Sequence, residues 1–195
     1  MLTNNEIKQI AYLHISCIDE GFLSSLGLNF LCQMYKAMDQ SKECFIITEV
    51  NGPHIVGFIS GGKGLTSIFK LLLKHPFKLF YSLIPRLLSW RVLTGIILTL
   101  FRILNPRDYK QELPINELFS IAVNSSYRRS GVAQVLYYGL CKEFKKRGVD
   151  EFKIFVGNKL QAANSFYTKM GAKPILKIES YGKKKSILYL HKFDI

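Results

Sequence analysis

The segment Ser120-Ile-Ala-Val-Asn-Ser-Ser-Tyr-Arg-Arg-Ser-Gly-Val-Ala-Gln-Val-Leu136 decides the fold of this chain. It predicts an apolar strand, a short polar turn and the start of an amphipathic helix, with Gly131 at the junction. The first backbone N–H groups of a helix have no partners within the helix, and the positive end of the helix dipole lies beside them. The segment therefore predicts an anion-binding site, to which Arg128 and Arg129 add positive charge.

Strands and helices alternate along the chain from this unit onward. Strands are expected over 115–123, 151–156, 175–181 and 186–193. Helices are expected over 132–147, ending at Gly148, and over 160–170. This order is typical of an α/β fold whose central strands are parallel.

Two helices are expected ahead of this unit. Thr3 and Glu6 have the spacing of a capping box, and apolar residues recur at helical intervals as far as Ile18. A second apolar stripe of the same period covers 28–38. His14 lies on the apolar side of the first helix, and we expect it to be a core residue.

A β-hairpin is expected between these helices and the α/β unit. Segments 43–50 and 54–61 are rich in β-branched and aromatic residues, and Asn51-Gly52 lies between them. Asn-Gly is the strongest short-range signal for a hairpin, because both residues tolerate the positive φ angles of the turn.

Composition predicts one folded domain, 1–195, with an anionic partner. Hydrophobic residues make up 48% of the 195 residues and charged residues 21%, which excludes a disordered chain. The formal net charge is +13, which indicates a nucleotide, a nucleic acid or a membrane surface as the partner.

The sequence gives no sign of a metal site, a disulfide framework or a secretory signal. The N-terminus lacks a basic start followed by an apolar block. The cysteines lie far apart in apolar surroundings without ligand spacing, at Cys17, Cys32, Cys44 and Cys141. We therefore expect reduced core cysteines, no metal and a cytoplasmic protein.

Segment 63–110 differs in character from the rest of the chain. It holds nine lysines or arginines against one acid, Asp108, and so supplies +8 of the net charge. Its most apolar stretch, 92–101, has ten residues, whereas a membrane-spanning helix needs about 20. Three explanations stay open: packing on the domain or on a second subunit, a peripheral helix on an anionic membrane, or a pocket for an acidic acceptor.

Two motifs resemble signatures of the GNAT superfamily of N-acetyltransferases. Arg128-Arg-Ser-Gly-Val-Ala133 resembles the acyl-CoA pyrophosphate loop, Gln/Arg-x-x-Gly-x-Gly/Ala. Ala163-Asn-Ser-Phe-Tyr-Thr-Lys-Met-Gly171 resembles the later signature Ala-x-x-Phe-Tyr-x-x-x-Gly-Phe, except that Ala172 replaces the final Phe. The resemblance implies a mixed sheet with helices on its faces and a cofactor slot between splayed strands, with 63–110 as an insertion.

The resemblance also implies acetyl-CoA as co-substrate. The backbone N–H groups from Arg129 to Ala133 would hold the pyrophosphate, and the pantetheine arm would lie along the strand that ends at Val123. The slot would open just beyond Val123 and near Gly157. An Asn of the family is Leu160 here, and Asn158 or Asn164 would take over its contact. The full expected set of cofactor-binding residues is Ile121, Ala122, Val123, Arg128, Arg129, Ser130, Gly131, Val132, Ala133, Asn158, Asn164 and Phe166.

Tyr167 and Glu117 are the candidate catalytic residues. The resemblance implies that the Tyr167 hydroxyl lies beside the CoA sulfur and protonates the departing thiolate. Glu117 interrupts an apolar strand and is the candidate base, acting through a water molecule. The alternatives are a core role for Tyr167 and a solvent-facing position for Glu117. Backbone N–H groups near Ile121 would stabilise the oxyanion.

The sequence therefore predicts an N-acetyltransferase that acylates a primary amine of an amino sugar, a sugar nucleotide or another small acceptor. The alternative is a non-catalytic module that binds acyl-CoA or associates with a membrane or nucleic acid. Nucleic acid is not the expected partner, because the chain carries no nucleic-acid-binding motif. A homodimer and peripheral membrane contact through 63–110 stay open.

Overall fold

The computed structural model describes residues 1–18, 22–64, 68, 72, 113–179 and 185–193. Most of segment 63–110 therefore lies outside the described residues. Ile68 and Leu72 are described, and both are buried in the core beneath the N-terminal helices. This burial agrees with the packing explanation for the first part of that segment.

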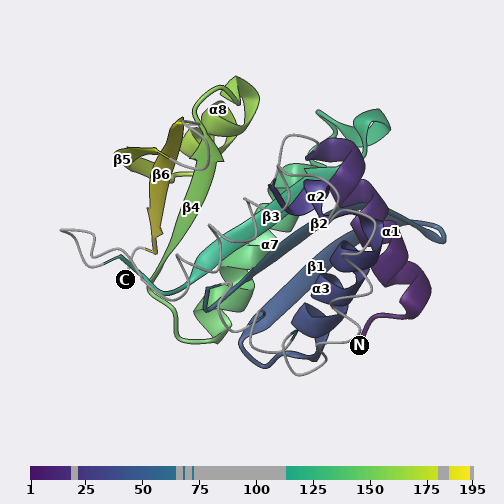
Figure 1. Ribbon diagram of the computed structural model, residues 1–195. Coiled ribbons are helices and arrows are strands. Elements are labelled where there is room, and N and C mark those ends of the chain that lie inside the picture. The colour runs from purple at the N-terminus through teal and green to yellow at the C-terminus, as the bar shows by residue number, and fades with distance from the viewer. Residues whose placement is uncertain (19–21, 65–67, 69–71, 73–112, 180–184, 194–195) are drawn as a thin grey trace.

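A mixed sheet forms the centre of the described chain, with strand order β1-β2-β3-β4-β6-β5 (Figure 1). All neighbours pair antiparallel except β3 and β4, which are parallel. The strands are β1 (Cys44–Asn51), β2 (His54–Gly62), β3 (Glu117–Val123), β4 (Glu151–Gly157), β5 (Lys173–Glu179) and β6 (Lys185–Lys192). The mixed α/β sheet expected from the sequence is confirmed, with strand ends shifted by one or two residues.

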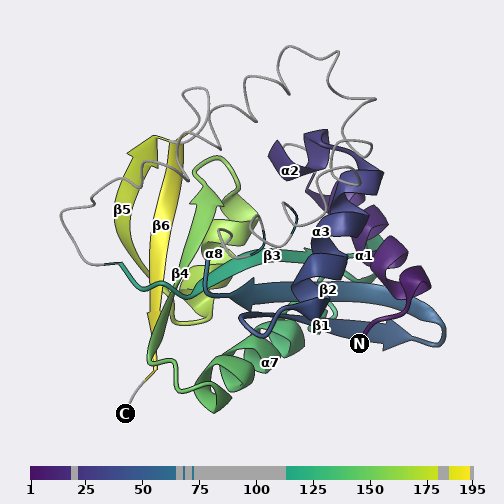
Figure 2. The same ribbon diagram turned by 60° about the horizontal axis from the view of Figure 1, so that its bottom comes forward.

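Helices cover both faces of this sheet (Figure 2). The helices are α1 (Asn4–Cys17), α2 (Phe22–Ser25), α3 (Leu28–Gln40), α7 (Val132–Lys146) and α8 (Gln161–Lys169). Helices α1 and α3 lie on one face of β1 to β3, and α7 lies on the other. The short helix α2 follows the break after α1 and was not predicted.

Local signals explain where the N-terminal elements begin. Thr3 accepts a hydrogen bond from the Glu6 backbone N–H, and Glu6 accepts one from the Thr3 backbone N–H, so the capping box is confirmed. The expected hairpin is confirmed as β1 and β2, but its turn is formed by Gly52 and Pro53. Asn51 is a strand residue that pairs with His54, and it does not have the positive φ that Gly52 has. His14 is buried as predicted, and burial lowers its pKa to about 4. The cysteines are free, but only Cys44 is fully buried.

Glycines in β2 let α7 approach the sheet closely. A Cβ atom at Gly57 would lie 2.9 Å from Val132 Cγ1 and 3.0 Å from Leu136 Cδ1, both on the first turns of α7. A Cβ atom at Gly61 would lie 3.1 Å from the Phe144 ring near the other end of the helix. The close packing of α7 on the sheet therefore depends on the absence of side chains at Gly57 and Gly61.

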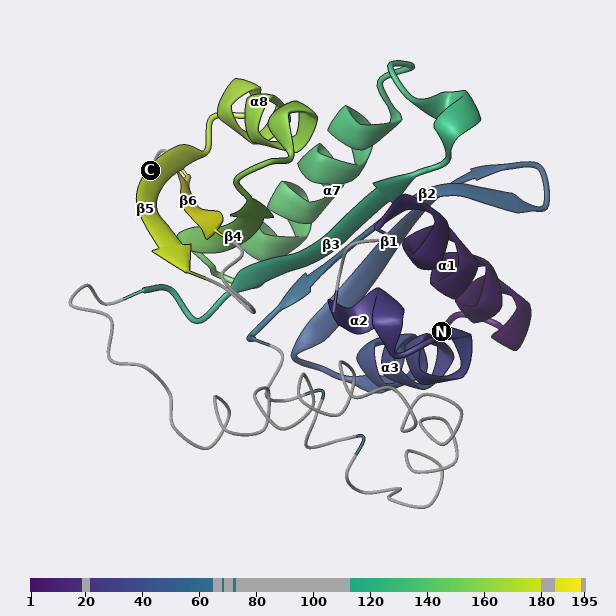
Figure 3. The same cartoon turned by 45° about the horizontal axis from the view of Figure 1, so that its top comes forward.

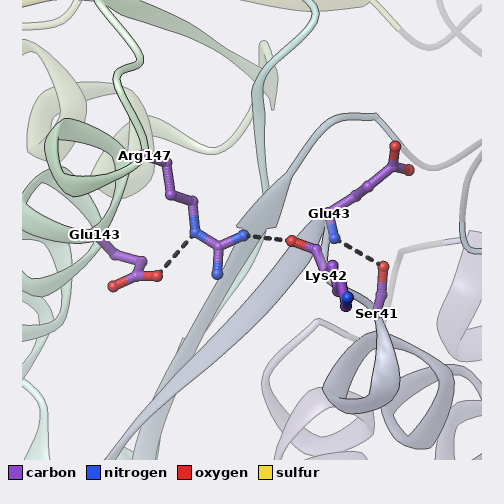
Figure 4. Close-up of polar contacts among 5 residues, drawn as sticks. All are labelled: Ser41, Lys42, Glu43, Glu143 and Arg147. Carbon is purple, nitrogen blue, oxygen red and sulfur yellow. Dashed lines mark hydrogen bonds and ion pairs between the residues drawn. The ribbon is translucent and has the colours of Figure 1, made fainter.

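Arg147 anchors the C-terminal end of α7 (Figure 4). Its Nε donates to Glu143 Oε1 at 2.8 Å, and its Nη1 donates to the Lys42 carbonyl oxygen at 2.9 Å, on the loop that leads into β1. The guanidinium carbon also lies 4.7 Å from the centre of the Phe45 ring. These contacts join two segments that lie 105 residues apart in the sequence.

Replacing Gly57 with Ala should destabilise the protein by about 1–3 kcal/mol, because the new methyl group overpacks the contact with α7. Gly139→Ala is the matched control: it lies inside α7, its Cβ would meet Ile47 at an ordinary 3.4 Å, and helix propensity should stabilise it by up to about 1 kcal/mol. Urea unfolding would measure both. Equal stabilities for the two variants would contradict close packing at Gly57.

Candidate functional site

Strands β3 and β4 separate soon after they begin (Figure 3). Their parallel pairing consists of Glu117 with Lys153 and Leu118 with Ile154. The opposite edge of β3 goes on pairing with β2 as far as Val123. From residue 119 onward, the edge of β3 toward β4 therefore has no strand partner among the described residues. The prediction that the strands open just beyond Val123 is wrong, because the opening begins after Leu118.

A β-bulge in β3 coincides with the start of this opening. Ser120 pairs with Ser60 and Leu118 pairs with Gly61, so Phe119 is an extra residue without a register partner in β2. A bulge bends the strand and interrupts its ladder of hydrogen bonds. The bulge thus gives a physical reason for the divergence of β3 from β4. The sequence around Phe119 contains no local signal that predicts this bulge.

The turn after β3 forms a backbone anion site at the start of α7. Arg129 and Gly131 both have positive φ, 64° and 89°, and Gly131 caps the helix without a side-chain hydrogen bond. The backbone N–H groups of Gly131, Val132 and Ala133 donate to no acceptor among the described residues. Successive N–H groups in such a turn converge on an anion, and the helix dipole has the same sign. Arg128, Arg129 and Ser130 are exposed beside them.

The end of β4 is joined to α8 through Asn164. Its Nδ2 donates to the carbonyl oxygens of Gly157 at 3.0 Å and Leu160 at 2.8 Å, and its Oδ1 accepts from the Tyr189 hydroxyl at 2.9 Å. The amide of Asn164 is therefore engaged within the protein. Asn158 is exposed in the turn before α8, and its backbone N–H donates to the Lys185 carbonyl oxygen. Cofactor contacts of both asparagines stay predictions.

Tyr167 lies in the core between α7, α8 and β6. Its side chain is 5% exposed and contacts the rings of Tyr137, Phe166 and Tyr189. A phenol is protonated at neutral pH, and burial raises the pKa of Tyr167 further, which makes it a weaker acid than a free phenol. Its hydroxyl makes no hydrogen bond to a described residue. A buried, neutral phenol is a proton donor, which is the state a general acid requires.

Glu117 lies where β3 and β4 are still paired. Burial raises its pKa to about 7, and the positive charge of Lys153 partly opposes this shift. Lys153 in turn donates to the Pro114 carbonyl oxygen at 2.6 Å. A carboxyl group that titrates near neutrality can accept a proton, as a general base must. Glu117 is half-buried, and its role as the base stays a prediction.

The other predicted residues of β3 divide between its two faces. Ala122 is buried in the core under α1 and α3, whereas Ile121 and Val123 pack partly against the core under α7. These residues share the free edge of β3, which leads directly to the turn at Gly131.

Comparison with known proteins gives this arrangement a family. The chain matches the acetyltransferase (GNAT) family over residues 13–172. The chain belongs to the GNAT acetyltransferase family. GNAT acetyltransferases are acyl-CoA-dependent N-acyltransferases, and this enzyme class therefore applies to the chain. No curated protein sequence matches it.

Several solved structures share the fold. A ribosomal-protein-alanine N-acetyltransferase from Brucella melitensis is similar at 11% identity and a TM-score of 0.63, covering 98% of this chain and 97% of that one. An aminoglycoside 6'-acetyltransferase type Ii is similar at 17% identity and a TM-score of 0.60, covering 98% and 94%. The PaiA N-acetyltransferase from Thermoplasma acidophilum, in complex with coenzyme A, is similar at 11% identity and a TM-score of 0.58, covering 98% and 96%.

The described part of this GNAT protein shows neither a helix able to cross a membrane nor a cluster of metal-ligating side chains.

Sequence reasoning missed a buried polar chain behind β3. His14 Nδ1 lies 2.6 Å from the Tyr35 hydroxyl, which also makes a hydrogen bond with Ser120. Ser60, the register partner of Ser120, is fully buried, and its Oγ has no hydrogen-bond partner among the described residues. Helical periodicity places His14 and Tyr35 on the apolar faces of their helices, but it does not bring them together.

The Tyr35→Phe variant should lose about 1–3 kcal/mol of stability, because His14 and Ser120 would each lose a buried hydrogen-bond partner. Ser60→Ala is the matched control, since it removes a buried hydroxyl that has no partner, and its stability should be unchanged or higher. Thermal and urea unfolding would compare them. If Ser60→Ala were the more destabilised variant, the polar chain would not have this role.

Proposed function

We propose that this protein transfers the acetyl group of acetyl-CoA to the primary amine of a small acceptor. The observation that carries the proposal is the continuous path from the free edge of β3 to the unpaired N–H groups at the start of α7. An extended acyl-pantetheine arm fits an unpaired strand edge, and a pyrophosphate fits a helix N-terminus.

The binding residues follow from this path. The N–H groups from Gly131 to Ala133 hold the pyrophosphate, and the exposed Arg128 and Arg129 neutralise its charge. The pantetheine pairs with the backbone of β3 between Ser120 and Val123, as an added strand would. A thioester at the inner end of this path would have its developing oxyanion near the backbone N–H groups around Ile121, in the part of β3 that has no partner strand on the β4 side among the described residues.

The reaction is a direct attack of the amine on the thioester. The amine loses a proton to Glu117 through a water molecule, and its nitrogen forms a bond to the acetyl carbonyl carbon. The tetrahedral intermediate then collapses, the C–S bond breaks, and Tyr167 donates a proton to the thiolate. The products are the acetamide and CoA.

The acceptor is an amino sugar, a sugar nucleotide or another small amine. The names of the similar structures refer to a ribosomal-protein alanine and to aminoglycosides, so they do not select among these classes. The proposed location is the cytoplasm, where acetyl-CoA is available. Acceptor recognition, peripheral membrane contact and dimerisation stay alternative predictions for 63–110.

Release of free CoA thiol from acetyl-CoA, followed with a panel of amines, tests the proposal. Tyr167→Phe should lower kcat by about 100-fold with CoA affinity kept, because the general acid is lost. Tyr138→Phe, on the exposed side of α7, is the matched control and should behave as wild type.

Gly131→Val should abolish CoA binding, because valine is strained at that positive φ. Binding without CoA release for any amine would favour a non-catalytic acyl-CoA-binding module.

The pH profile of kcat/KM should depend on Glu117. Because this carboxyl group must be ionised to act as a base, the rate should rise with pH through about 7 and level off above it. Glu117→Gln should lower the rate and remove that rise. In Lys153→Met, loss of the nearby positive charge should raise the pKa of Glu117 and move the rise to higher pH. A rise that persisted unchanged in Glu117→Gln would exclude Glu117 as the base.

A further inference from the structure

The tip of the β1–β2 hairpin contacts the turn that precedes α7. Asn51 Nδ2 donates to the Tyr127 hydroxyl oxygen at 2.6 Å, although the two residues are 76 positions apart. Tyr127 is the last residue of the 3-10 helix η1 (Ser125–Tyr127), which directly follows β3. Figures 1 and 3 show the hairpin tip and the segment that follows β3 at the same end of the sheet.

Hydrogen bonds extend this contact into the anion-binding turn. The Tyr127 carbonyl oxygen accepts from Ser130 Oγ at 2.6 Å, and Ser130 immediately precedes Gly131. The start of η1 is also fixed, because Asn124 Oδ1 accepts from the Ser126 N–H at 3.0 Å. These hydrogen bonds therefore connect the hairpin tip to Ser130, the residue before the helix cap Gly131.

The hairpin tip is itself held by α1. Gln9 Oε1 accepts from the Ile55 N–H at 2.8 Å, and Gln9 Nε2 donates to the Pro53 carbonyl oxygen at 3.2 Å. Two bonds from one side chain fix both the position and the rotation of the tip. The side chain of Asn51 therefore donates to Tyr127 from a hairpin tip that α1 holds in place.

The turn needs such support. Arg128, Arg129 and Ser130 are exposed, and Arg129 has a positive φ that is unfavourable for a residue with a side chain. A turn that must order itself on ligand binding loses affinity, whereas a turn that is already ordered keeps it.

We infer that Asn51 and Tyr127 are positioning residues for acetyl-CoA: through the hairpin tip they hold the pyrophosphate turn in its binding conformation. The inference rests on the proposed function and adds to it a role for the hairpin. Neither residue touches the reacting atoms, so their effect belongs to cofactor binding and not to the chemical step.

The experiment compares Asn51→Ala, Tyr127→Phe and the double variant. Each single variant should raise the KM for acetyl-CoA and the Kd for CoA by about three- to tenfold, the effect of one hydrogen bond, with kcat unchanged. The double variant should bind CoA about as tightly as each single variant, because either substitution alone already removes the hydrogen bond between Asn51 and Tyr127. Hydrogen exchange at the amides of Gln134 and Val135, which donate to the Gly131 carbonyl oxygen, should accelerate in all three.

Asn4→Ala is the matched control. It removes another exposed asparagine hydrogen bond, from Lys36 Nζ at 3.4 Å, and should leave the KM unchanged. Unchanged CoA affinity in both single variants, additive losses in the double variant, or a fall in kcat at constant KM would each overturn the inference. If wild-type protein bound no CoA, the proposed function and this inference would fail together. If wild type bound CoA and the variants bound it equally well, only this inference would fail.

Discussion

The short parallel pairing of β3 with β4 is the constraint on which the rest of the site depends. Because only two residue pairs join these strands, β3 is held on one edge by β2 and is free on the other for most of its length. A fully paired sheet would satisfy these backbone groups internally and leave no edge for a ligand. The bulge at Phe119 interrupts the ladder with β2 and bends β3 next to the point where its pairing with β4 ends.

The position of α7 turns this free edge into a site. Its N-terminus lies directly after the turn at Gly131. Its position on the sheet is set by Gly57 near this end and by Gly61 and Arg147 near the other. Gly57 and Gly61 bring the helix close to β2, so its unpaired N–H groups have a defined place relative to β3. The anion site is therefore a consequence of core packing as much as of the loop sequence.

Buried and half-buried polar groups lie around the point where the strands separate. Glu117 lies at the pairing itself, and the hydrogen-bonded chain of His14, Tyr35 and Ser120 lies on the α1 and α3 side of β3. Burial opposes charge on each titratable member, so the pKa of Glu117 rises and that of His14 falls. The same low polarity that holds the core together thus prepares Glu117 to exchange protons near neutral pH.

The amino-acid sequence by itself determined the elements and the chemistry of the turn. The capping box at Thr3, the hairpin at Asn51-Gly52 and the strand, turn and helix around Gly131 are local signals, each contained within a few residues. Only the tertiary structure decided where β3 leaves β4, that Lys153 lies beside Glu117, and that Asn51 reaches Tyr127. The physical reason is that strand register and cross-chain hydrogen bonds depend on residues far apart in the chain, which side-chain periodicity does not relate to one another.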